Sequence, residues 1–537
     1  MTVNNNISKI ISLITSKGFQ IHPDALVLLE NLREDMLQTI EDLLKQKKKK
    51  KEKSMVILSH DIQSFIESPY RTLDEKQVKG SLNGINKEKD LTLHTMDSNI
   101  FLSEHKYIYK DTYGKDGGNF RVIHDSNDKI NSGEGVEGFS SLFTSRYEKC
   151  LKILSSRSDS KRIKKIGLIK QIFNQTKINS NSTDKEYSEN SLFIAGLVME
   201  KNIKKNSYDV TIDDQTGLLT ASAYNDELKR QVSMLTLDQM IMIELENNQK
   251  NRKFTIKNLY SLDIPDRIPS RSNSEVYSVL ISDLHIGSKF FMEQQFNNFL
   301  DWLNGTNGYG KDIVSKIKYI CICGDLIDGI GIFPNQDKEL LEKDAYSQMN
   351  HAIEILSKIP KHMKIFLIPG NHDLGRRALP QPSIPQKYAS KLYTLENVTM
   401  LGNPCMIDME GIKTLMFHGQ SLDDVIATIP GLSYSKPAEA MKILLKARHL
   451  SPIYGQRTPI APEAEDMMVI EEVPDILHSG HVHVIDVDSY KGTLLVNSGA
   501  WQTQTPFQQT MGITPTPGIA IVINLSTLKP YQISFNN

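Results

Sequence analysis

Cysteine, net charge and long apolar segments are all scarce in this sequence. Its 537 residues include four cysteines, and only Cys321 and Cys323 lie close together, within one strand-like apolar segment. We interpret them as buried thiols of a protein that stays in a reducing compartment. The formal net charge is -1, so any binding to nucleic acid would have to depend on a local basic patch.

Targeting signals are also missing. No run of about 18 apolar residues occurs, which predicts that no transmembrane helix is present and that no membrane is a partner. The N-terminus lacks a basic start followed by an apolar stretch and a small-residue cleavage site, so we expect no signal peptide and a cytoplasmic location.

The length of the chain is too great for one hydrophobic core and predicts about two to four domains. Apolar residues at helical spacing predict a helical N-terminal domain over residues 1–70, either a small bundle or a docking module for a partner. Residues 71–165 are polar and irregular, which indicates a flexible low-complexity linker.

Two further domains are expected after that linker. Residues 166–268 predict a small β-barrel, with the oligonucleotide-binding (OB) fold as the leading candidate, because five short strand-like segments lie at 193–198, 208–212, 218–223, 240–244 and 254–259. Such a barrel can bind a nucleic-acid strand or serve only as a protein interface. Residues 275–537 alternate strand and helix patterns, which favours an α/β sandwich.

Five short motifs rich in Asp, Asn and His follow in order along this last segment, four of them directly after a strand-like run. They are Ser282-Asp283-Leu284-His285, Gly324-Asp325-Leu326-Ile327-Asp328, Gly370-Asn371-His372-Asp373, Phe417-His418-Gly419 and Gly480-His481-Val482-His483. Loops at the carboxyl ends of neighbouring strands meet at one edge of a sheet. There, carboxylate, amide and imidazole groups suit Mn²⁺, Fe²⁺ or Zn²⁺. Each motif alone is a weak signal, but the ordered set predicts a metal site.

The set resembles the calcineurin-like metallophosphoesterase superfamily, whose pattern is D-x-H, G-D-x-x-D, G-N-H-[DE], H and G-H-x-H. This resemblance implies a four-layer α/β/β/α sandwich, with two sheets flanked by helices. It also implies two divalent metal ions. One would be bound by Asp283, His285, Asp325 and His483, and the other by Asp325, Asn371, His418 and His481, with Asp325 as the bridge. Mn²⁺ is the first choice, and Fe, Zn, Ni and Mg also fit.

The same resemblance implies catalytic roles for two residues outside the ligand set. His372 matches the histidine that protonates the leaving oxygen. Asp328 matches the carboxylate that orients this histidine. Asp373 and His478 are expected to be structural or supporting residues.

A closer resemblance is carried by residues 453–463, 474–483 and 496–506, which are similar to the small subunit of the archaeal family D DNA polymerase. That family implies a 3′→5′ exonuclease that proofreads during DNA replication, releasing 5′-mononucleotides from the primer 3′ end. It implies a large catalytic polymerase subunit as partner, a sliding clamp as a further candidate partner, and association with the archaeal nucleoid. A non-catalytic scaffold and a stand-alone phosphatase or repair nuclease are the alternative functions.

Contacts to DNA are predicted less directly. Arg376 and Arg377 follow the third motif and Arg457 lies in an Arg-Thr-Pro loop, so each is a candidate phosphate contact or an ordinary solvated side chain. Trp501 and Phe507 lie near the predicted site loops, where they either stack on a base or pack in the core.

Overall fold

The computed structural model describes residues 118–176, 192–248, 253–306 and 310–536, with a few positions before residue 118. The chain divides into two units, Met1–Ile100 and Phe101–Asn537. In the first unit β1 (Gln20–Ile21) pairs in parallel with β2 (Val56–Ile57). The helical domain predicted over residues 1–70 and the predicted linker up to residue 117 lie, apart from those positions, outside the described residues. Among the described helices, none combines the length and the apolar character that crossing a membrane requires.

The second unit contains two six-stranded sheets. The first has the order β12-β11-β10-β9-β18-β19. Its parallel half consists of β9 (Tyr277–Ile281), β10 (Ile317–Cys323), β11 (Lys364–Ile368) and β12 (Val398–Met400), and its antiparallel edge of β18 (Ile519–Asn524) and β19 (Lys529–Ser534). The second has the order β16-β17-β15-β14-β13-β3. Its strands are β3 (Phe120–Asp125), β13 (Cys405–Met409), β14 (Ile412–Met416), β15 (Ile476–Ser479), β16 (Asp486–Tyr490) and β17 (Thr493–Asn497).

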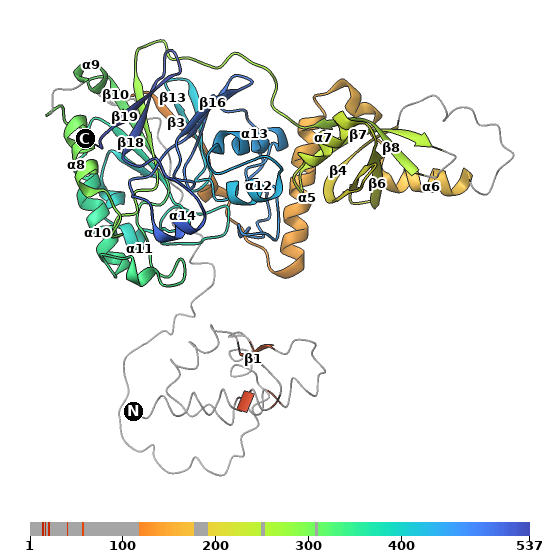
Figure 1. Cartoon of the computed structure of the whole chain (residues 1–537), viewed down its shortest axis with the longest axis horizontal. Helices are drawn as coiled ribbons and strands as arrows, with labels where there is room; N and C mark the ends of the chain where they lie inside the picture. The colour runs from red at the N-terminus through yellow and green to blue at the C-terminus, as the bar shows by residue number, and fades with distance from the viewer. Residues whose placement is uncertain are drawn as a thin grey trace, which may run out of the picture. The chain divides into compact units, whose positions relative to one another are not determined.

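The two sheets pack face to face between layers of helices, and β10 shows why. Cys321 and Cys323 point into an apolar core shared with Ile407 and Val496 of the second sheet, whereas Ile320 and its neighbours on the other face contact a helix layer. That layer contains α8 (Glu293–Leu303) and α10 (Ala345–Leu356). The outer face of the second sheet is covered by α12 (Leu422–Thr428) and α13 (Pro437–Ala447), as Figure 1 shows. The mixed α/β prediction is confirmed, and all four cysteines are buried and free.

The segment between β3 and β9 contains a closed barrel with the strand order β4-β5-β6-β8-β7. Its strands are β4 (Leu192–Ile203), β5 (Tyr208–Asp213), β6 (Leu218–Ala223), β7 (Met240–Asn248) and β8 (Lys253–Ser261). An apolar interior that includes Ile194, Val210 and Ile243 is closed by α6 (Ile166–Thr176) and α7 (Asp226–Ser233).

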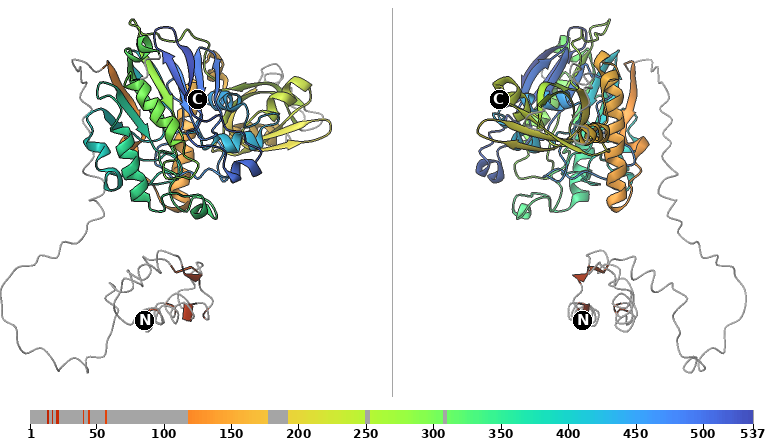
Figure 2. Two further views of the ribbon diagram at one scale, coloured as in Figure 1. Left: turned by 60° about the vertical axis from the view of Figure 1, so that its left-hand side comes forward. Right: turned by 90° about the vertical axis from the view of Figure 1, so that its right-hand side faces the viewer.

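The predicted linker is wrong over residues 118–165. There, β3 pairs antiparallel with β13 at the edge of the second sheet, and α5 (Gly135–Leu154) is a long helix (Figure 2). Tyr147, Cys150 and Leu154 recur at helical spacing and are buried in one apolar cluster with the barrel residues Phe193 and Met240. The polar residues on either side of this apolar stripe made the whole segment resemble a linker in the sequence.

A buried ion pair fixes α5 to the sandwich. Arg146, 1% exposed, donates to the carboxylate of Asp466 at 2.7 Å. Its guanidinium also donates to the carbonyl oxygens of Pro452 at 2.6 Å and of Asp238 at 3.2 Å. The helix therefore contacts both the sandwich and the barrel.

Candidate metal centre

The predicted ligands stand on loops that leave the carboxyl ends of five strands, β9, β10, β11, β14 and β15. Short backbone hydrogen bonds join these loops. The Asp283 N–H donates to the carbonyl of Gly324 at 3.0 Å, and the His285 N–H donates to that of Asp325 at 3.1 Å. The sequence thus places ligands at one edge of both sheets, as the order of the motifs predicts.

The backbone at this edge is strained where the ligands are. Positive φ values, which L side chains rarely adopt, occur at Asp283 (54°), His285 (51°), Asp325 (51°), His481 (67°) and His483 (64°). Each such residue costs on the order of 1–3 kcal/mol, and such strain concentrates at functional sites. The fold therefore holds these side chains in place at the expense of stability.

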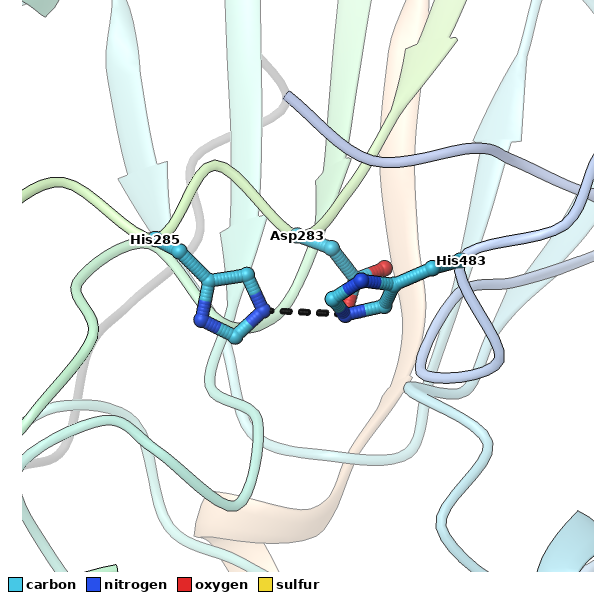
Figure 3. A group of neighbouring side chains, drawn as sticks. All are labelled: Asp283, His285 and His483. Atoms are coloured by element: carbon cyan, nitrogen blue, oxygen red, sulfur yellow. Dashed lines mark hydrogen bonds and ion pairs between the residues drawn. The ribbon is translucent and has the colours of Figure 1, made fainter. Parts of the chain in front are cut away.

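One group of converging donors comprises Asp283, His285 and His483 (Figure 3). The Nε2 atoms of His285 and His483 lie 3.0 Å apart. Nε2 of His483 lies 3.4 Å, and that of His285 3.9 Å, from Oδ1 of Asp283. Nitrogen and oxygen lone pairs directed at one buried point are an arrangement that a divalent cation would satisfy.

A second group comprises Asp325, His418 and His481, to which Asn371 adds an amide oxygen. This oxygen lies 3.0 Å from Nε2 of His418 and 2.9 Å from Nδ1 of His481. Oδ2 of Asp325 lies 3.3 Å from His418 and 3.8 Å from His285 of the first group. The structure thus brings every predicted ligand together and gives Asp325 a position between the two groups.

The charges within the cluster suit bound metal ions, as its geometry does. Burial raises the pKa of Asp325, but the imidazoles of His418 and His372 outweigh it and hold this pKa well below its usual value. Burial lowers the pKa of His285 and of His418, yet the neighbouring carboxylates raise both to about 9. The buried carboxylates therefore require positive charge, which protons on the histidines supply here and which bound cations would replace.

The second ring nitrogen of each candidate histidine ligand also has a partner. Nδ1 of His285 lies 3.1 Å from Oδ1 of Asp328, and Nδ1 of His418 lies 2.8 Å from the carbonyl oxygen of Cys323. Such partners fix ring orientation and tune ligand basicity.

Asp423 is a residue of this kind that the sequence did not indicate. Its carboxylate lies 3.3 Å from Nε2 of His481. Burial raises the pKa of Asp423, but His481 and the hydroxyl of Tyr434 lower it overall. An acidic residue in the first turn of α12 is common in any helix, so only the fold reveals its contact with a ligand.

His372 is oriented differently from the prediction. Its Nδ1 lies 2.8 Å from the backbone carbonyl oxygen of Asp328, not from the carboxylate. That carboxylate is already engaged by His285, and by Gln336 at 3.0 Å and Gln502 at 3.1 Å. Burial lowers the pKa of His372 to about 4, so the free ring is neutral at pH 7.

Asp373 and His478 support the site from behind, as predicted. Asp373 accepts hydrogen bonds from the N–H groups of Leu326 at 3.1 Å and Gly370 at 2.9 Å, which joins the second and third motifs. His478 contacts the Ser498 hydroxyl at 2.9 Å, and Ser498 donates to Ser282, which donates to Asp283.

A cavity of about 250 Å³ opens beside the cluster. Its lining includes His372, candidate ligands of both groups, and the aromatic residues Phe333, Tyr434 and Phe507. The cluster of candidate metal ligands therefore borders this cavity.

The comparisons agree on one family. Residues 278–483 match the family described as the B subunit of DNA polymerase alpha/epsilon. The DNA polymerase II small subunit of Methanothermobacter thermautotrophicus is 37% identical over 420 residues, 77% of this chain and 83% of that protein. That of Archaeoglobus fulgidus is 38% identical over 414 residues, 76% of this chain and 78% of that protein. The chain belongs to the family of archaeal DNA polymerase II small subunits.

The match covers a smaller share of some members of this family. The small subunit of Pyrococcus furiosus is 37% identical over 416 residues, 75% of this chain but only 65% of that protein. Among solved structures, an archaeal phosphodiesterase is 12% identical with a TM-score of 0.25, covering 48% of this chain and 99% of that one. This score is too low to add to the assignment, which depends on the sequence relatives.

The three arginines predicted to contact DNA differ in their exposure and in their contacts within the protein. Arg376 donates to buried Glu463 at 2.6 Å and to Ser132 at 3.0 Å, so its guanidinium is engaged within the protein. Arg377 is exposed. Arg457 is exposed as well, and its side chain hydrogen bonds Tyr434 on the cavity wall.

The two aromatic residues predicted as candidates for base stacking differ in their burial. Trp501 is fully buried among Phe296, Phe299 and Phe535, which excludes stacking on a base. Phe507 is 55% exposed at the cavity and remains a candidate.

Proposed function

We propose that this small subunit carries a two-metal phosphodiesterase that removes nucleotides from the 3′ end of DNA. The observation that carries the proposal is the position of Asp325, whose Oδ2 lies 3.3 Å from a histidine of one donor group and 3.8 Å from a histidine of the other. Asp283, His285, Asp325 and His483 would bind one ion, and Asp325, Asn371, His418 and His481 the other. Mn²⁺ is the first candidate, with Fe, Zn, Ni and Mg as alternatives.

Bound divalent ions would neutralise phosphate charge and lower the pKa of a water nucleophile. The protein's own part in the chemistry falls chiefly to His372. The carbonyl of Asp328 contacts its Nδ1 at 2.8 Å, so Nε2 is the nitrogen available to the cavity. The negative charge of a bound phosphodiester would raise the low pKa of His372. A protonated His372 can then donate to the departing 3′ oxygen, so that a 5′-mononucleotide is released.

The surrounding assembly is part of this proposal. Family membership supports a large catalytic polymerase subunit as partner, with the primer 3′ end as substrate and the archaeal nucleoid in the cytoplasm as location. A sliding clamp is a further candidate partner. The closed five-stranded barrel supports an OB fold. Its exposed apolar residues, Met199, Ile203 and Tyr224, also suit a protein interface, so a scaffolding role can accompany catalysis.

The test uses a 5′-labelled primer with a mismatched 3′ end, the full chain and Mn²⁺ or Mg²⁺. Stepwise shortening by the wild type is expected, with a loss of about 10²–10⁴-fold in rate for His372→Ala. Asp325→Ala should abolish the reaction, whereas Asp226→Ala, at a fully exposed carboxylate of the barrel, should not change it. Absence of shortening even with the large subunit present would leave the scaffold as the function.

A further inference from the structure

Two phenyl rings lie together in the lining of the cavity. Phe333 and Phe507 are stacked, with ring centroids 6.1 Å apart and planes 24° from parallel. Phe333 lies 6.4 Å from the ring of His372, and Phe507 is 55% exposed. A large apolar surface left open directly beside a buried, charged cluster indicates contact with a ligand rather than with the core.

The loop that presents Phe333 is tied to the catalytic cluster. The side chain of Gln336 accepts from the N–H of Ile332 at 2.9 Å. It donates to both the carbonyl and the carboxylate of Asp328, at 2.8 Å and 3.0 Å. Since Asp328 also contacts His285 and His372, the ring of Phe333 is positioned by the same residue that positions them.

The ring of Phe507 is anchored in a similar way. It belongs to α14 (Pro506–Thr510), which starts with a reciprocal capping box between Thr505 and Gln508. The side chain of Gln508 reaches the ligand His483, with its Nε2 2.7 Å from the ring Nδ1. The pair of phenyl rings is therefore held at a fixed place relative to the cluster.

We propose that Phe333 and Phe507 form a stacking platform for the base of the 3′-terminal nucleotide. This inference rests on the proposed function and names its substrate class: a 3′ end whose last base is present but unstacked. A phenyl face accepts any base, so the platform would not select sequence. A paired terminal base must first leave the duplex stack, so frayed or single-stranded ends are favoured.

The first experiment measures binding without hydrolysis. A single-stranded oligonucleotide with 2-aminopurine at its 3′ end is titrated with the full chain in EDTA. Stacking should quench the fluorescence for the wild type and for Phe507→Trp, whereas Phe507→Ala and Phe333→Leu should lose most of the quenching. Tyr346→Ala is the matched control, because this tyrosine is 54% exposed but outside the cavity lining. Absence of quenching by the wild type, or equal quenching by all variants, overturns the platform.

The second experiment compares hydrolysis of a normal 3′ end with that of an abasic 3′ end in Mn²⁺. The wild type should prefer the normal end by about 10- to 100-fold in kcat/KM, as expected for one stacked base. Phe507→Ala should reduce this preference several-fold, whereas the control Tyr346→Ala should keep the wild-type preference. An unchanged preference contradicts the platform. If no substrate is hydrolysed at all, the proposed activity fails, and the binding experiment still decides on the platform.

Discussion

Single residues at the metal centre are constrained by very close approaches between the motif loops. A Cβ placed on Gly370 would lie 2.2 Å from Oδ1 of Asp325, and one on Gly480 would lie 2.3 Å from Oδ2 of Asp283. The glycines of the G-N-H and G-H motifs therefore leave space for the two carboxylates, which gives these motif positions a steric reason.

Gly480→Ala should displace Asp283 and weaken divalent-metal binding by about 10- to 100-fold, a loss comparable to that from misoriented metal ligands. Isothermal titration with Mn²⁺ measures the change. Gly411→Ala is the control, because it introduces strain at a φ of 88° but has nothing within 4 Å of the added Cβ. Equal Mn²⁺ affinity in Gly480→Ala and the wild type would show that Asp283 is not a ligand.

Asp423→Asn should lower the affinity for the ion proposed at His481, again by about 10- to 100-fold, because an amide orients the imidazole less firmly and raises its basicity less. Competition against a chromogenic chelator measures this affinity. Asp226→Asn, at an exposed carboxylate that belongs to none of the described donor groups, should keep the wild-type affinity. Equal metal affinities in the two variants would mean that the Asp423 contact does not support metal binding.

The convergence of the candidate ligands could be predicted from the sequence, because each belongs to a short motif next to a strand, where chain direction alone fixes its place. Asp423 and the orientation of His372 could not be, because both depend on contacts between segments far apart in the chain. Arg376 shows the same limit: only the fold brings buried Glu463 to its guanidinium.

Among the elements, the strand pattern was predictable and α5 was not. The barrel strands combine apolar runs with turn residues, and the structure contains a strand at each of the five predicted barrel segments. By contrast, α5 docks partly through a charged residue, Arg146, whose burial depends on Asp466. A buried arginine has no signature in the sequence, so the polar flanks of α5 suggested a linker.

The docking site of α5 should make stability depend on pH. Nε2 of His449 contacts Asp466 at 3.0 Å, and its Nδ1 accepts from the Ser451 N–H at 3.0 Å, contacts that suit a neutral ring. Burial and Arg146 lower the pKa of His449 to about 4. Between pH 6.5, the ordinary pKa of the histidine, and about pH 4, His449 is protonated in the unfolded chain but neutral in the folded protein. Stability should therefore fall as the pH falls through this window.

The measurement is urea unfolding at pH 7.5 and pH 5.0 for the wild type and His449→Gln. The stability advantage of the wild type should shrink by up to about 1.4 kcal/mol per pH unit below 6.5. Burial raises the pKa of Asp466, but His449 and Arg146 hold it well below its usual value, so its contribution is lost only at more acidic pH. A constant difference between the two proteins would mean that folding does not lower the pKa of His449.

For the molecule as a whole, the corrected boundary changes which fragment should fold. A chain starting at residue 166 would lack β3 and α5, leaving β13 as an open sheet edge and Asp466 without its buried cation. Removing one partner of a buried ion pair costs about 3–5 kcal/mol, and an unprotected edge strand invites association. A chain starting at residue 118 keeps both elements and the contacts they make.

We therefore expect residues 118–537 to unfold cooperatively in urea as a single monomeric species. Residues 166–537 should be less stable by at least about 3–5 kcal/mol, or should aggregate, because the apolar face beneath α5 would also meet water. Urea unfolding and size-exclusion chromatography of the two fragments distinguish these outcomes. Equal stability of the two fragments would mean that residues 118–165 are a linker that the fold does not need. Instability of both fragments would place part of the required fold before residue 118.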